Sequence, residues 1–329
     1  MEQQMKYRNV GKSGLKVSEI AMGSWMTELQ NQQRIDIAEQ TIQLAYERGI
    51  NFFDCADAYS GGDAERFLGT VLRKYKRSTL VISSKVFYPT GDSVNECGLS
   101  RKHIFESIDQ SLENLQTDYL DLYFCHRFDE ATPMEETLQA MSDLVVQGKI
   151  LYYGVSEEWG AARLEEAQKI IDHLSLRPMT AVQPQYNMFD RYIEQGIMEI
   201  CEKYGMGITP FSPLAQGLLT GKYKKGEPLP EGSRATHQAD RQINNMLTDE
   251  NLDKVEKLSV IAAEMNIPMS VLALAWILRK KAVCSVITGA SKAEQLNKNI
   301  AASGIELSQE VIDKIEEILK FRKLERHIG

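Results

Sequence analysis

The feature that most constrains the fold of this chain is a regular alternation between short apolar runs and stretches with helical periodicity. Eight apolar runs are candidate β-strands, at residues 19–23, 51–54, 79–85, 119–124, 150–154, 180–183, 206–211 and 283–287. Between them, apolar residues recur at spacings of three and four, which is typical of helices with one buried face, as in Ile104, Ile108, Leu112 and Leu115. Strands that alternate with helices in this way predict a parallel sheet.

These strand–helix units favour closure into one α/β domain over residues 1–329, a (β/α)8 TIM barrel. Two doubly wound halves are a weaker interpretation, because no linker divides the chain and no G-x-G-x-x-G motif follows the first run. The opening KYRNVGKSGLKVS predicts an N-terminal β-hairpin that caps the other end of the barrel. Apolar periodicity predicts extra C-terminal helices, one around 252–261 and one over about 308–320.

Local signals add detail to this prediction. Residues 212–249 are long, polar and punctuated by Gly and Pro, and predict a functional loop after the seventh strand. Ser100 is the predicted N-cap of the third helix. The fourth helix is expected to start with a capping box formed by Thr132 and Glu135, with Pro133 in the first helical position.

Composition narrows the functional classes. The chain has 46 acidic and 38 basic residues, and the resulting charge of −8 has the wrong sign for binding nucleic acid or an anionic membrane. Five scattered cysteines without a C-x-x-C pair suggest neither a disulfide framework nor a zinc site, so no metal is predicted. No apolar run has the length of a bilayer span and the N-terminus is polar, so a cytoplasmic location is expected.

Polar residues follow the predicted strands, where barrel enzymes carry their chemistry. In chain order, the residues at these ends are Ser24 with Trp25, Asp54, Lys85, His126, Ser156, Gln183, Ser212 and Gly289. A packed apolar core does not account for this series. Asp54, Lys85 and His126 come from successive strands, and Tyr59 lies in the loop after Asp54, so we expect all four side chains at one mouth of the barrel.

These four residues form a candidate proton-transfer site. A neighbouring ammonium favours the phenolate, so Lys85 is expected to lower the pKa of Tyr59 from its usual value of about 10. Asp54 would hold Lys85 and keep it protonated, and His126 could hydrogen-bond a substrate carbonyl oxygen. The alternative is a structural ion pair between Asp54 and Lys85 with a satisfied interior histidine, but the spacing to Tyr59 favours function.

Over essentially its whole length the chain resembles the aldo-keto reductase family. GINFFDCADAYSGGDAERFLG is similar to the family's Asp/Tyr signature, Lys85 and His126 occupy its other two tetrad positions, and SPLAQGLLTGKY resembles its phosphate-gripping loop. MKYRNVGKSGLKVSEIAMGSW, GLSRKHI and TPMEET resemble the branch that holds the potassium-channel β subunits and the bacterial glyceraldehyde-3-phosphate (aldehyde) reductases.

The resemblance implies hydride transfer from NADPH to an aldehyde or ketone, with Tyr59 as the general acid. Ser156 and Gln183 would hold the nicotinamide carboxamide, and Phe211 would stack on its ring. The pyrophosphate and adenosine would be bound by Ser212, Leu214, Gln216, Lys222, Arg234, Ser291, Gln295 and Asn299. Ser24, Trp25 and Gly289 complete the predicted cofactor-binding set, although Trp25 is equally a candidate wall of the substrate pocket or a plug in the barrel mouth.

The phosphate half of this prediction also has independent support. Lys222 and Arg234 follow the seventh strand, while Lys292 and Lys298 follow the eighth, which are the usual phosphate-binding elements of a barrel. Ser291 is expected to cap the helix after the eighth strand, whose N-terminus would favour an anion.

Two functions remain open. A cytosolic aldehyde reductase is favoured by His126, where the channel β subunits carry asparagine; the alternative is an NADPH-sensing regulatory subunit that docks on a membrane protein. The chain departs from the pattern of the related branch at two positions. Glu157 stands where the channel β subunits have arginine, and Lys298 replaces an acidic residue in the region expected to bind the adenosine. Both positions bear on the geometry of the cofactor. A barrel hydrolase or isomerase lacks the paired carboxylates or metal cluster that it would need. A homo-oligomer is a candidate assembly because the related branch often forms tetramers.

Overall fold

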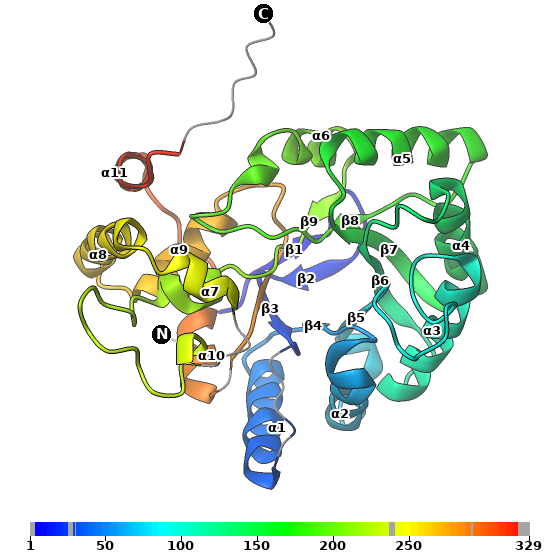
Figure 1. Ribbon diagram of the computed structural model, residues 1–329, viewed down its shortest axis with the longest axis horizontal. Coiled ribbons are helices and arrows are strands. Elements are labelled where there is room, and N and C mark those ends of the chain that lie inside the picture. Colours follow the sequence, from blue (N-terminus) through cyan, green and yellow to red (C-terminus); the bar gives the residue numbers. More distant parts are fainter. Residues whose placement is uncertain (1–3, 26–28, 30, 237–240, 291, 322–329) are drawn as a thin grey trace, which may run out of the picture.

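The computed structural model describes residues 4–321 except 26–28, 30, 237–240 and 291. Its centre is a ring of eight parallel strands (Figure 1) in the order β10-β3-β4-β5-β6-β7-β8-β9. The strands are β3 Ile20–Gly23, β4 Phe52–Asp54, β5 Val81–Val86, β6 Leu120–Arg127, β7 Ile150–Glu157, β8 Ala181–Val182, β9 Gly207–Ile208 and β10 Val286–Thr288. This arrangement confirms the predicted strands and their parallel sheet.

The two ends of this strand order meet and close the ring. A parallel bridge pairs Ile208 with Val283, just before β10. The Ile287 amide also donates to the carbonyl oxygen of Pro210 at 2.9 Å. The curled sheet with its closing bonds confirms the (β/α)8 barrel.

Strands β8 and β9 are shorter than the apolar runs that predicted them. Pro184 and Pro210 follow them closely, and proline has no backbone N–H to donate to a ladder. Strands β6 and β7 instead continue beyond their apolar runs, so His126 and Ser156 lie within strands rather than after them.

Helices cover the outside of the ring (Figure 1). They are α1 Gln32–Glu47, α2 Asp63–Leu72, α3 Arg101–Leu115, α4 Met134–Gln147, α5 Ala161–Leu174, α6 Ile197–Tyr204, α9 Met269–Leu278 and α10 Ala293–Ile300. The extra helices α8 Asp249–Glu264 and α11 Gln309–Leu319 confirm the two predicted from the periodicity. Short helical turns, η4 Ala215–Thr220 and η5 Arg234–Thr236, and α7 Arg241–Met246 lie in the segment 212–249, which the sequence predicts as a loop.

One helix start agrees with the sequence prediction and another does not. The Ser100 side chain accepts a hydrogen bond from the His103 amide, as an N-cap does. The capping box predicted for α4 is wrong, because Pro133 occupies the N-cap position and no side chain caps the helix. The Thr132 hydroxyl instead donates to the Asp129 carboxylate at 2.7 Å, so it is engaged by the preceding loop.

The predicted hairpin is formed by β1 Tyr7–Asn9 and β2 Lys16–Ser18, which pair antiparallel. Val10 and Val17 are fully buried against residues inside the ring, including Phe52 and Leu122. The Lys12 amide donates to the Gly205 carbonyl just before β9, so the hairpin seals the amino-terminal end of the strands. The candidate functional residues lie at the opposite end, where the strands have their carboxyl termini.

No single helix in the described part of the chain has both the length and the apolarity to cross a bilayer. Within the same described ranges, α8 and α9 meet that length and composition only when taken together, with a bend of 89° between them.

Candidate active site

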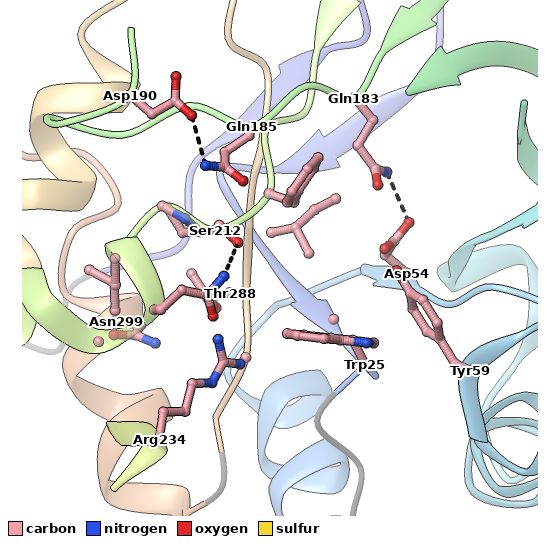
Figure 2. A pocket seen from close by; sticks show the side chains of 18 of the residues that line it. Trp25, Asp54, Tyr59, Gln183, Gln185, Asp190, Ser212, Arg234, Thr288 and Asn299 are labelled. Carbon is pink, nitrogen blue, oxygen red and sulfur yellow. Dashed lines mark hydrogen bonds between the residues drawn. The ribbon is translucent and has the colours of Figure 1, made fainter. Parts of the chain in front are cut away.

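An elongated cavity of about 1330 Å³ opens at the carboxyl ends of the strands. Asp54 and Tyr59 lie at one side of it and Ser212, Arg234 and Asn299 at the other, with Trp25 between them (Figure 2). Because parallel strands all end at this edge, the barrel brings residues that are far apart in the sequence to the same cavity.

A buried ion pair lies beside this cavity. The Lys85 ammonium on β5 contacts the Asp54 carboxylate on β4 at 2.7 Å and the Cys55 carbonyl oxygen at 2.5 Å. The other Asp54 oxygen accepts hydrogen bonds from Ser83 at 2.6 Å and from the Gln183 amide at 3.0 Å. Burial alone would lower the pKa of Lys85, but Asp54 and Tyr59 raise it and the net shift is upward, so this lysine stays charged.

Tyr59 begins the tight turn η1 Tyr59–Gly62, in which Ser60 and Gly61 have left-handed backbone angles with φ of 51° and 61°. Its hydroxyl lies 3.3 Å from the Lys85 ammonium, as predicted from the spacing. The expectation of a lowered pKa is wrong. Burial raises the pKa of Tyr59 to about 12 and outweighs the opposing effect of Lys85, so the residue is a neutral phenol.

His126 forms the neighbouring wall of the cavity. It is buried, its ring meets the rings of Tyr59 and Tyr88 edge-on, and its Nδ1 has no hydrogen-bond partner among the described residues. Burial, and secondarily the charge of Lys85, lowers the pKa of His126 to about 2. A neutral imidazole beside a phenol can hydrogen-bond a carbonyl oxygen without carrying charge.

Most of the predicted cofactor residues line the same cavity. They are Trp25, Ser156, Gln183, Phe211, Ser212, Leu214, Gln216, Lys222, Arg234, Gly289, Gln295 and Asn299. The Ser156 hydroxyl donates to the backbone carbonyl oxygen of Gln183 at 2.7 Å, and the side-chain amide of Gln183 donates to Asp54 at 3.0 Å.

The far half of the cavity is built by an unusual turn. Ser212, Ala215, Gln216 and Gly217 all have positive φ values, and the Gln216 amide donates to the Ser212 hydroxyl at 3.0 Å. Lys222 follows this turn, Arg234 lies with its guanidinium 5.0 Å from the Trp25 ring centre, and Lys298 enters from α10. Three basic side chains therefore gather where the sequence predicts phosphates.

Two residues of the predicted cofactor-binding set are not placed at the cavity. Ser24 is buried and donates its hydroxyl to the Asp54 backbone carbonyl at 3.0 Å, so it supports the strand end instead of lining the cavity. Ser291 lies outside the described residues. Lys292, rather than Ser291, occupies the N-cap position of α10, and it does not line the cavity.

Sequence reasoning missed several residues around the site. Ser83 had a usable signal, because it lies two positions before Lys85 on β5 and so faces the same side of the strand. Tyr88 follows the end of the same strand. The remaining cavity residues that were missed include Arg127, Glu158, Gln185, Asp190, Tyr192 and Thr288.

Comparisons with known proteins agree with this architecture. Residues 19–320 match the sequence model described as the aldo/keto reductase family. The chain is 41% identical over 322 residues to a protein from Oryza sativa subsp. japonica called "Probable voltage-gated potassium channel subunit beta", with 96% of this chain and 97% of the relative covered. A protein of the same name from Arabidopsis thaliana is equally similar, at 41% identity over the same coverage.

Proposed function

We propose that this chain, which belongs to the aldo/keto reductase family, reduces aldehyde or ketone carbonyls to alcohols with NADPH as the hydride donor. Members of this family are typically NAD(P)H-dependent oxidoreductases. The observation that carries the proposal is the contact of 3.3 Å between the Tyr59 hydroxyl and a buried, charged lysine at the edge of the cavity. This is the arrangement that a proton donor to an oxyanion needs.

The cavity residues fit a dinucleotide. Its elongated form joins the buried Ser156–Gln183 pair near Asp54 to a basic region around Lys222 and Arg234. The basic side chains and the backbone turn at 212–217 could bind the pyrophosphate and the 2′-phosphate of NADPH. Ser156 and Gln183 could hydrogen-bond the carboxamide of its nicotinamide. When bound there, NADPH supplies the hydride that adds to the carbonyl carbon.

The chain's own residues would supply the proton to the carbonyl oxygen. His126, kept neutral by burial, hydrogen-bonds that oxygen and orients it toward Tyr59. The raised pKa keeps Tyr59 protonated until negative charge develops on the oxygen, and the phenol then donates its proton. Lys85 stabilises the phenolate that remains, and Asp54 holds Lys85 in place.

A Tyr59→Phe substitution tests this proposal. We expect kcat for a panel of aldehydes, including methylglyoxal and glyceraldehyde 3-phosphate, to fall by about 10²–10⁴-fold, because the proton donor is lost while the ring remains. NADPH oxidation is followed by absorbance, and NADPH binding by quenching of protein fluorescence should be unchanged. Tyr75→Phe is a matched control, because Tyr75 stacks on Tyr46 and does not line the cavity.

The second candidate is a regulatory subunit that binds NADPH with little turnover, and the names of the two plant relatives favour it. NADPH binding by the unmodified protein without reduction of any aldehyde in the panel would support this second function and contradict the first.

A further inference from the structure

Glu157 lies at the cavity edge, beside the residues that would hold the substrate carbonyl. It is the last residue of β7 and follows Ser156 directly. Its Oε2 accepts a hydrogen bond from the Tyr88 hydroxyl at 3.2 Å, and the Tyr88 ring packs edge-on against His126 with 4.9 Å between ring centres. Tyr88 thus connects Glu157 to the wall against which a substrate substituent would rest.

Around Glu157, negatively charged side chains outnumber positively charged ones. Arg127 pairs with Glu157 across the β6–β7 ladder, but its guanidinium contacts both carboxylate oxygens of Glu158, with 2.8 Å from Nε to Oε2. One cation therefore faces two carboxylates. Asp190, which accepts from the Gln185 amide at 2.7 Å, adds a third carboxylate to the cavity lining.

The other cations that line the cavity, within the described part of the chain, come from other elements. Lys222, Arg234 and Lys298 belong to the phosphate half, and Arg34 belongs to α1, after β3. Among the cavity-lining residues of β6, β7 and the segment after β8, carboxylates therefore outnumber cations. In a partly enclosed site this excess acts strongly on a charged ligand, because the local dielectric constant is lower than that of water.

We propose that Glu157, held by Tyr88 beside His126, makes the enzyme discriminate against anionic carbonyl substrates and favour uncharged or cationic ones. This inference rests on the proposed reductase function and adds the substrate class. It also gives a role to Glu157, which the sequence links only to the geometry of the cofactor.

The test compares two aldehydes of nearly the same shape, 4-formylbenzoate and its uncharged methyl ester. Reduction is measured at pH 8, because burial raises the pKa of Glu157 and the carboxylate must be ionised. We expect Glu157→Gln to increase kcat/KM for 4-formylbenzoate relative to the ester by about tenfold. Glu166→Gln, on the exposed side of α5 and away from the cavity, is the matched control and should leave this ratio unchanged.

A second variant guards against a folding defect. Tyr88→Phe keeps the ring against His126 but removes the hydroxyl that holds Glu157, so a smaller increase in the same ratio is expected. Active Glu157→Gln enzyme with an unchanged ratio overturns the inference and leaves the reductase function intact. A wild type that prefers 4-formylbenzoate also overturns it, and would indicate an anion site around Arg34. Failure to reduce these two aldehydes and every aldehyde of the panel contradicts the reductase function, and the inference falls with it.

Discussion

Asp57, two residues before Tyr59, is a buried carboxyl group in the loop that presents the Tyr59 side chain to the cavity. Both of its carboxylate oxygens are buried. Burial, and then the nearby Glu65, raises the pKa of Asp57 to about 8, whereas an aspartate in the unfolded chain has a pKa of about 3.9. Between these values the folded protein keeps a proton that the unfolded chain has released, so Asp57 makes the fold less stable as the pH rises.

Asp57→Asn should therefore stabilise the protein at neutral pH. The amide is uncharged in both states, so we expect the free energy of unfolding at pH 7.5 to increase by about 1–3 kcal/mol, with little change at pH 4. Urea denaturation at the two pH values measures this difference. Asp118→Asn, at an exposed position before β6, is the control, and an equal effect of Asp57→Asn at both pH values would contradict the prediction.

At this scale the sequence predicted which groups meet but not their protonation. The positions of Asp54, Lys85 and Tyr59 could be inferred because strand ends in a parallel barrel converge. The direction of the Tyr59 pKa shift could not, because it depends on how completely other parts of the chain bury the phenol. Ser24 shows the same limit. At a strand end, a shift of one position along the chain decides whether a side chain lines the cavity, as Trp25 does, or bonds to the neighbouring strand, as Ser24 does.

At the scale of elements, the N-terminal hairpin depends on one close backbone approach. Gly11 has a φ of +56°, and a Cβ there would lie 2.1 Å from the Gly205 carbonyl oxygen and 2.6 Å from the Gly207 amide. The backbone of the hairpin turn would have to move away from the strand it seals.

We expect Gly11→Ala to lower the free energy of unfolding by about 2–4 kcal/mol, through both the clash and the left-handed backbone. Gly14 lies in the same hairpin, and a Cβ added there would meet no atom within 4 Å, so Gly14→Ala should change stability by less than about 0.5 kcal/mol. Thermal and urea unfolding of the two variants would test the difference. Equal effects would mean that the hairpin is not held by this contact.

Element boundaries were predicted less well than element types. The fourth helix was placed correctly, but its capping box was not, because Asp129 engages the Thr132 hydroxyl. Strands β8 and β9 ended early at prolines that interrupt the pairing. The helix start is decided by a contact with Asp129 and the strand ends by prolines that lack an N–H, and the hydrophobic period reports neither.

At the scale of the whole molecule, the proposed NADPH site joins segments that are otherwise separate. η4, η5 and α10 contribute to one cavity with β4 and β7. A ligand that binds only the folded state stabilises it by about 2.7 kcal/mol at 100 times its dissociation constant. NADPH should therefore raise the melting temperature by several degrees in a concentration-dependent way.

Comparison with NADH tests whether the phosphate half of the cavity binds the 2′-phosphate of NADPH. We expect Arg234→Ala to reduce the melting-temperature shift from NADPH more than the shift from NADH, because only NADPH carries the extra phosphate. Lys76→Ala, at an exposed position outside the cavity, should reduce neither shift. Equal losses with both nucleotides would place Arg234 elsewhere along the cofactor, and no shift with either would contradict the NADPH site.

The two ends of the barrel have different functions. The hairpin seals one end with buried valines and backbone contacts, and the cavity residues occupy loops and strand ends at the other. Substitutions that alter substrate choice can therefore accumulate at the mouth without loosening the seal, and the seal can be tightened without disturbing the chemistry. Protein engineering and natural selection can therefore change stability at one end of the barrel and substrate specificity at the other nearly independently.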